Sequence, residues 1–116
     1  MRILQNGREL CSAEIADSFL SRLKGLMFQK KLDRDSGLFI QNCSSIHTCF
    51  MYFPIDVIYL DRNCTVLYTE TVAPWRIGKI VKHTRHVLEL PVGNKEKYLI
   101  GSQLQLTVAD ARSAER

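Results

Sequence analysis

The sequence predicts a mainly β fold, a compact antiparallel sandwich or barrel with one short amphipathic helix. Three observations lead to this prediction. Several short runs are rich in β-branched and aromatic residues, which is typical of strands. Turn-forming residues separate these runs at short intervals. Apolar residues make up 46% of the 116 residues and charged residues 24%, the composition of a single globular domain.

The N-terminal residues predict a β-hairpin. Two short runs, 2–5 and 8–11, flank Asn6 and Gly7. An Asn-Gly pair favours positive φ at both central positions, which suits a two-residue type I′ turn. Further along, a brief strand is expected over 38–41, where a polar segment ends it.

The most pronounced strand signal follows Pro54. Proline cannot donate a hydrogen bond to a ladder, so it marks a bend, an edge or the start of a new strand. Residues 55–60 are rich in isoleucine, valine and tyrosine, and 61–63 have the composition of a turn. We therefore expect a second hairpin, whose return strand covers 64–71.

One segment has helical periodicity, from residue 19 to residue 27. Its apolar residues recur on one helical face: Phe19, Leu20, Leu23, Leu26 and Met27. Asp17 or Ser18 can cap the first free amides, and Gly25 weakens or ends the helix. A short amphipathic helix is expected here.

The C-terminal third predicts further short strands. Residues 86–90 and 99–100 are strand candidates, with a turn over 91–94 between them. Over 104–108, apolar and polar residues alternate, which is the pattern of a half-buried strand.

The chain is expected to be one domain over residues 1–116, with a core over 2–108 and a frayed tail over 109–116. No apolar run reaches the length of a membrane span and no signal-peptide pattern is present, so we expect a soluble cytoplasmic protein with no membrane partner. The four cysteines form no CxxC pair, which favours reduced thiols. The net charge of +4 is compatible with nucleic acid or an acidic partner, but argues for neither.

Several residues between 43 and 61 are candidates for chemistry. Cys43, His47 and Cys49 are donor types that bind zinc, but an extended chain separates the two cysteines by about 20 Å. We therefore expect no metal and no cofactor. Cys49 could be a thiolate activated by His47, yet its apolar surroundings would bury it and raise its pKa.

Asp56 lies within an apolar strand. An unpaired buried carboxylate there would cost several kcal/mol, so Asp56 either faces solvent or has a partner. The candidate partners are cations and hydroxyls: Arg85, His86, Thr48 and Thr84. Two interpretations stay open, a buried polar network that fixes strand register and a polar pocket formed by His47, Thr48, Asp56 and Arg85.

Residues 74–86 are basic and irregular. Trp75, Arg76, Lys79 and Lys82 could hold phosphates and stack a base, which makes them a candidate nucleic-acid site. More often such a run is a solvated loop, and no known nucleic-acid motif accompanies it. Nucleic acid is therefore an unlikely partner.

A set of short motifs occurs in a characteristic order along residues 8–108. They are Gly25-Leu26-Met27, Gly37-Leu38-Phe39, His47-Thr48, Met51, Phe53-Pro54-Ile55-Asp56, Leu60-Asp61, Pro74, Arg85 and Leu88-Glu89-Leu90-Pro91-Val92-Gly93. In their order and spacing the chain resembles the bacterial and archaeal family called domain of unknown function number 192. The resemblance implies a compact, jelly-roll-like β fold with one short helix. It implies no reaction, substrate or cofactor, and many relatives carry tryptophan and methionine in place of His47 and Thr48.

Three functions follow as hypotheses. The leading one is a non-enzymatic domain that binds a small ligand or a protein partner, because no catalytic constellation has all its members at workable spacing. The alternative is a small enzyme that uses His47 and Asp56 as an acid–base pair. The second alternative is weak nucleic-acid binding through residues 75–86.

Overall fold

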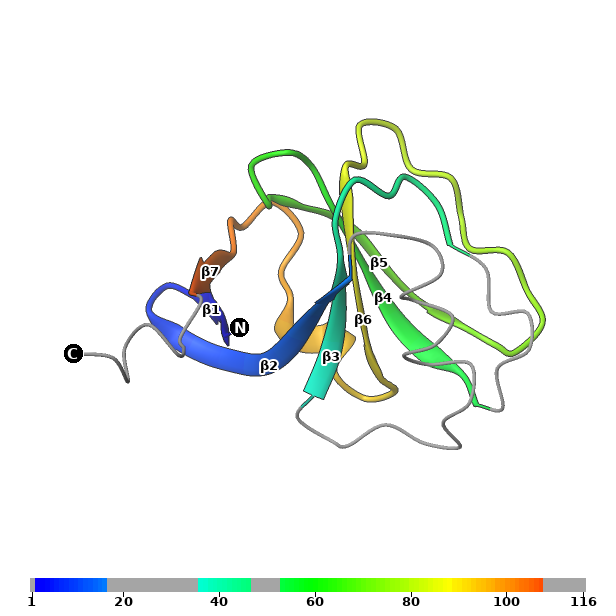
Figure 1. Cartoon of the computed structure of the whole chain (residues 1–116), viewed down its shortest axis with the longest axis horizontal. Coiled ribbons are helices and arrows are strands. Elements are labelled where there is room, and N and C mark those ends of the chain that lie inside the picture. The colour runs from blue at the N-terminus through cyan, green and yellow to red at the C-terminus, as the bar shows by residue number, and fades with distance from the viewer. Residues whose placement is uncertain (1, 17–35, 47–52, 108–116) are drawn as a thin grey trace.

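A computed structural model describes residues 2–16, 36–46 and 53–107. The predicted mainly β fold is confirmed: the described residues form one continuous sheet of seven strands, in the order β5-β4-β6-β3-β2-β1-β7, which does not close into a barrel (Figure 1). The strands are β1 (Arg2–Gln5), β2 (Arg8–Ala16), β3 (Ser36–Ile40), β4 (Ile55–Leu60), β5 (Val66–Val72), β6 (His86–Pro91) and β7 (Gln105–Thr107). The 3-10 turn η2 (Lys95–Lys97) precedes β7.

Both predicted hairpins are present. β1 pairs with β2 around a turn in which Asn6 and Gly7 both have positive φ. β4 has the predicted bounds and pairs antiparallel with β5. β5 begins later than expected because Cys64, at φ 63°, still belongs to the turn.

The sheet departs from the antiparallel prediction at one place, because β2 and β3 pair in parallel. Parallel neighbours need a long crossover, and residues 17–35 provide one between these strands. The helix predicted over 19–27 falls in that connection and lies outside the described residues. The strand predicted over 99–100 is wrong, since the Ser102 N–H donates to the Leu99 carbonyl (3.0 Å) and closes a turn there.

The two faces of the sheet carry separate clusters of buried side chains. Every residue of β4 is buried, so this strand contributes to both. Its alternate residues Ile58 and Leu60 belong to one cluster, while Ile55, Val57 and Tyr59 belong to the other. Strand alternation therefore places Asp56 on the Ile58 side of the sheet.

β2 connects the two halves of the sheet. Its first residues pair with β1, and its last residues, from Ser12 to Ala16, pair with β3. Figure 1 shows β2 sweeping from the β1–β7 end of the molecule to the group formed by β3, β4, β5 and β6. The N-terminal hairpin and β7 thus lie at one end, and β5 forms the opposite edge.

Candidate functional site

Asp56 is fully buried, and its carboxylate is the centre of a hydrogen-bond network. Oδ1 accepts a hydrogen bond from Thr71 Oγ1 on the neighbouring strand β5 (2.6 Å). Oδ2 accepts three more from the backbone N–H groups of Gly93 (3.0 Å), Asn94 (2.9 Å) and Lys95 (2.8 Å). Both carboxylate oxygens accept hydrogen bonds, which is the arrangement expected of a buried polar network.

The turn after β6 is built to receive a negative charge. Gly93 has φ 102°, a conformation that side chains rarely tolerate, and this lets successive N–H groups converge. Such a concave set of amides binds anions, and here the anion is the protein's own Asp56. The Asn94 side chain donates to the Pro91 carbonyl (2.8 Å) and closes the turn. Asp56 thereby fixes residues 91–95 against β4 and β5.

The structure does not bring Arg85 to Asp56. The exposed Arg85 donates its backbone N–H to the Leu60 carbonyl (2.8 Å), at the opposite end of β4. Leu60 is four positions along the strand from Asp56, about 13 Å away. His47 and Thr48, the other predicted pocket residues, lie outside the described residues, so their part in a pocket stays a prediction.

The remaining expected partners of Asp56 are used elsewhere. His86 Nδ1 accepts the Asn42 N–H (3.2 Å). Burial, together with the positive charge of Arg85, lowers the pKa of His86, which keeps this nitrogen an acceptor. Thr84 Oγ1 donates to the Val81 carbonyl (2.7 Å) inside its own loop. Both residues therefore have local structural roles.

The described residues contain no group of three histidine, cysteine or acidic side chains that could hold a metal ion. Of the predicted donor set, only Cys43 is described; its thiol donates to the Ser45 carbonyl (2.8 Å). His47 and Cys49 lie outside the described residues.

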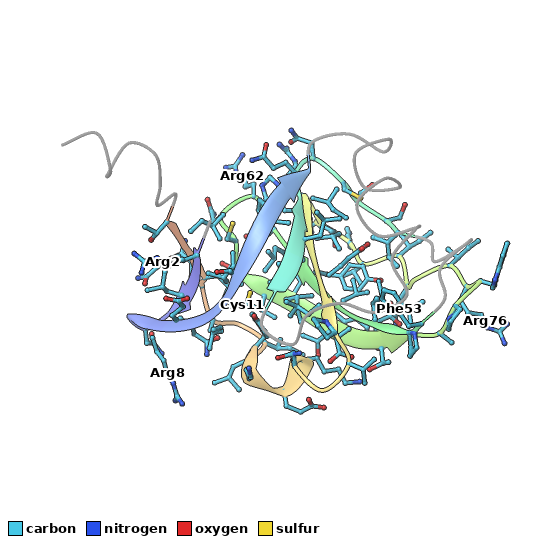
Figure 2. The ribbon with its side chains drawn as sticks, turned by 60° about the horizontal axis from the view of Figure 1, so that its bottom comes forward. Arg2, Arg8, Cys11, Phe53, Arg62 and Arg76 are labelled. Atoms are coloured by element: carbon cyan, nitrogen blue, oxygen red, sulfur yellow. The ribbon has the colours of Figure 1, made fainter. Side chains whose placement is uncertain are left out.

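The second candidate site is the irregular connection over residues 74–82, called here the 74–82 loop. Three large apolar side chains are exposed on it: Trp75 (60%), Ile77 (75%) and Ile80 (78%). The basic residues Arg76, Lys79 and Lys82 lie between and beside them, and all three are exposed. In Figure 2, Arg76 lies at the far end of the molecule from Arg2 and Arg8 and points outward.

The middle of the 74–82 loop is fixed to the sheet. Gly78 is buried and donates its N–H to the Ile46 carbonyl (2.9 Å). A Cβ at this position would lie 2.6 Å from the Tyr59 hydroxyl and 2.9 Å from the Ile46 side chain, so only glycine fits. Because the backbone is held at Gly78, the neighbouring Ile77 and Ile80 are directed away from the core.

A carboxylate reinforces this attachment. Glu70 Oε2 accepts the Lys79 N–H (2.7 Å) and also the hydroxyl of the buried Tyr59 (2.5 Å). Burial, and then this bond to Glu70, raise the pKa of Tyr59, which keeps it a protonated donor. The Lys79 ammonium lies 4.9 Å from the centre of the Tyr68 ring, within cation–π range.

Replacing Tyr59 with phenylalanine should therefore loosen the loop. The substitution removes one hydrogen bond to a carboxylate, and we expect the free energy of unfolding to fall by about 1 kcal/mol. Urea denaturation measures this. Tyr68→Phe is the matched control, because it keeps the ring beneath Lys79 and should leave stability unchanged. Equal effects of the two substitutions would contradict the role assigned to the Tyr59 hydroxyl.

The sequence analysis names Asp56 and the basic residues as candidates but not the residues that position them: Thr71, Gly93, Gly78, Glu70 and Tyr59. The partners of Asp56 are mostly backbone amides. Every residue type except proline has one, so residue type does not predict which amides will bind. A signal was available in the predicted turn over 91–94, whose glycine permits converging amides. For Gly78 and Glu70 the contacts are tertiary, and the sequence holds no local signal for them.

Known proteins resemble this chain in sequence and in fold. The family model of DUF192, described as "Uncharacterized ACR", matches residues 1–108. The chain belongs to this family. Its relatives include the UPF0127 protein of Pyrococcus horikoshii, 44% identical over 71% of this chain and 74% of the relative. The UPF0127 protein of Pyrococcus abyssi is 36% identical over 79% of this chain and 83% of the relative.

Solved structures share the fold of this DUF192 member. One is a protein from Sinorhizobium meliloti described as a candidate transcription regulator, with a TM-score of 0.73 and 22% identity over 90% of this chain and 89% of the other. Another is a protein of unknown function from Novosphingobium aromaticivorans, with a TM-score of 0.73 and 17% identity over 90% and 82%. These likenesses extend to the fold alone. Across the described residues, no helix has the length and apolar character needed to cross a membrane.

Proposed function

We propose that this protein is a non-catalytic binding domain that recognises an acidic segment of a partner protein through the 74–82 loop. The observation that carries the proposal is the exposure of Ile77 and Ile80 on either side of a buried, hydrogen-bonded Gly78. A surface that is already ordered loses little conformational entropy on binding. Tryptophan and arginine, both on this loop, are the residue types that dominate binding energy at protein interfaces.

The backbone at Trp75 supports the same conclusion. Its φ of 61° is in the left-handed region, which costs a residue with a side chain about 1 kcal/mol. Strain of this kind persists where the surroundings enforce it, and it clusters at ligand-contacting sites. The orientation of Trp75 is therefore maintained at a cost to stability, as expected of a recognition residue.

The charge of the loop favours an acidic partner. The 74–82 loop contains three basic side chains and no acidic one: Arg76, Lys79 and Lys82. Arg85 follows it closely. Complementary charge accelerates association and excludes partners of like charge. An acidic segment that also carries apolar residues matches both properties of the loop.

The enzyme alternative, with His47 and Asp56 as an acid–base pair, has less support. A catalytic carboxylate must reach a substrate proton directly or through one water. Asp56 is fully buried and accepts four hydrogen bonds, so such a reaction would first have to break its network. The small-ligand alternative is also less favoured, since it calls for a concave apolar site rather than outward-pointing side chains.

Nucleic-acid binding would use the same cations, with Trp75 as a stacking surface. Ile77 and Ile80 argue for protein instead, because aliphatic side chains offer no flat face to a base. We place the activity in the cytoplasm as part of the proposal. Its support is the sequence, whose four cysteines form no CxxC pair and so favour the reduced thiols of a reducing compartment.

Selection from a displayed library of random peptides tests this proposal. We expect immobilised protein to enrich acidic peptides that contain apolar residues. The double variant Ile77→Ser/Ile80→Ser should weaken their binding about thirtyfold, since each serine removes roughly 1 kcal/mol of apolar contact. Lys82→Ser should weaken it further, whereas Arg8→Ser, at the far end of the molecule, should not.

Two outcomes would contradict the proposal. One is the absence of any enriched peptide that discriminates the wild type from the double variant. The other is tighter binding of a mixed single-stranded oligonucleotide than of any selected peptide, with loss of that binding in Trp75→Ala.

A further inference from the structure

Within the described part of the chain, the outer edge of β5 is unpaired along most of its length. β5 is a terminal strand of the sheet, and its start is covered: the Val66 N–H donates to the Ser102 carbonyl (2.8 Å), and the Val66 carbonyl accepts the Gly101 N–H (2.8 Å). Thr65 continues this pairing through a bridge to Gln103. Beyond Val66, no segment in the described part of the chain is hydrogen-bonded to this edge.

The ladder register identifies the outward-facing groups. In an antiparallel pair, residues alternately direct their N–H and carbonyl toward the partner strand and away from it. Val66, opposite Leu60, directs both groups outward. Tyr68, the next paired residue beyond the register shift, faces inward, so Thr69 and Thr71 face outward. Two N–H groups and two carbonyls are thus arranged to receive another strand.

Lysine and proline, two common blocks to edge pairing, are absent from β5. Exposed edges are commonly blocked by lysine, proline or very short strands. β5 has 7 residues, VLYTETV, with neither lysine nor proline. Its one charge, Glu70, is engaged by Tyr59 and the Lys79 backbone. By contrast β7, at the other edge, has only 3 residues.

The surroundings of the open edge favour an acidic strand. On one face, the Lys79 ammonium stands over the Tyr68 ring of β5. On the other, Lys95 supplies one of the three amides bound to Asp56, which also accepts from Thr71 of β5. Leu99 (58% exposed) and Ile100 (65% exposed) directly precede Gly101 and supply apolar contacts where the open stretch begins.

A second copy of this chain fits the edge less well. Antiparallel self-pairing that uses the outward groups of both Thr69 and Thr71 places the basic 74–82 loops of the two copies at the same junction. Charges of the same sign repel each other there, whereas an acidic segment is attracted.

We propose that an acidic peptide segment, in extended conformation, adds to the outer edge of β5 as a further strand. Its backbone pairs with Thr69 and Thr71, and its side chains contact the 74–82 loop and Ile100. This inference rests on the proposed function and names its binding mode: backbone hydrogen bonds supply affinity, and the flanking cations and apolar residues supply specificity.

The test uses a fluorescent, end-capped peptide of alternating glutamate and valine, 7 residues long to match β5. Fluorescence anisotropy gives its Kd. We expect Thr69→Pro, which deletes an outward N–H on an edge strand that tolerates proline, to weaken binding about tenfold or more. Thr69→Val keeps the N–H and should bind like the wild type. Peptide binding should also slow hydrogen exchange at the Thr69 and Thr71 amides.

A second probe keeps the test decisive if Thr69→Pro fails to fold. Two versions of the peptide carry N-methyl groups on alternate amides, one on the odd residues and the other on the even residues. The amides of only one set face β5, so one version should bind wild-type protein at least tenfold more weakly than the other. Equal binding of both N-methylated registers, or exchange protection away from β5, would overturn strand addition. If Ile77→Ser/Ile80→Ser still weakened the peptide in that case, the proposed function would stand without this binding mode. Dimerisation of peptide-free protein that Thr69→Pro abolishes would instead assign the edge to a second copy.

Discussion

Replacing Asp56 with alanine is expected to lower the free energy of unfolding by about 4 kcal/mol. The substitution deletes four hydrogen bonds to a charged group and leaves three backbone N–H groups of the 93–95 turn without their acceptor. Losing an acceptor costs more than the bond itself, because the buried donor has also lost water. Urea denaturation monitored by tryptophan fluorescence measures the loss.

Asparagine at the same position is the matched control. Its carbonyl can still accept from the three amides, while its NH₂ group faces Thr71, whose hydroxyl can reverse from donor to acceptor. We expect Asp56→Asn to cost about 1.5 kcal/mol, the difference between charged and neutral acceptors. Wild-type stability in Asp56→Ala would contradict the network, and would reopen the interpretation of Asp56 as part of a pocket.

The second large effect is expected at Gly78. Gly78→Ala places a methyl group 2.6 Å from the Tyr59 hydroxyl and 2.9 Å from the Ile46 side chain, closer than real Cβ contacts allow. Relief requires the loop or the buried ring to move, and overpacking of this kind costs about 3 kcal/mol. The same movement should misplace Ile77 and Ile80, so binding of a selected peptide should weaken as well.

A double variant isolates the cause. With Tyr59→Phe present, the closest clashing atom is gone, and we expect Gly78→Ala to cost about 1 kcal/mol less than it does alone. Strict additivity of the two substitutions would show that contact with the Tyr59 hydroxyl is not what excludes a side chain from position 78. Ile80→Ala, on the exposed part of the loop, should leave stability unchanged and serves as the folding control.

The sequence predicts the local structure well and the long-range strand pairing poorly. Residues 55–60 were predicted with their observed bounds, because a proline, a β-branched run and a polar turn all agree there. The turn at Asn6 and Gly7 was equally clear. The parallel pairing of β2 with β3 was missed, since it depends on how residues 17–35 return the chain, and no residue in either strand records that.

The candidate site divides in the same way. An aspartate in an apolar strand predicts a partner, but the candidates Arg85, His86 and Thr84 make their contacts elsewhere, and Thr48 lies outside the described residues. Backbone amides of a distant turn supply that role instead. The sequence predicts a basic, irregular segment over 74–86, but the attachment of its 74–82 part through Glu70 and Tyr59 arises only when β4 and β5 lie side by side.

The position of β1 in the sheet has a consequence for synthesis. β1 lies between β2 and β7, so a strand from the start of the chain depends on residues 105–107 for its second neighbour. During translation the β1–β2 hairpin leaves the ribosome long before β7 is made, and its free edge waits unpaired. Pairings this distant in sequence slow folding and expose nascent chains to aggregation. β1 therefore gains its second neighbour only after residue 107 has left the ribosomal tunnel.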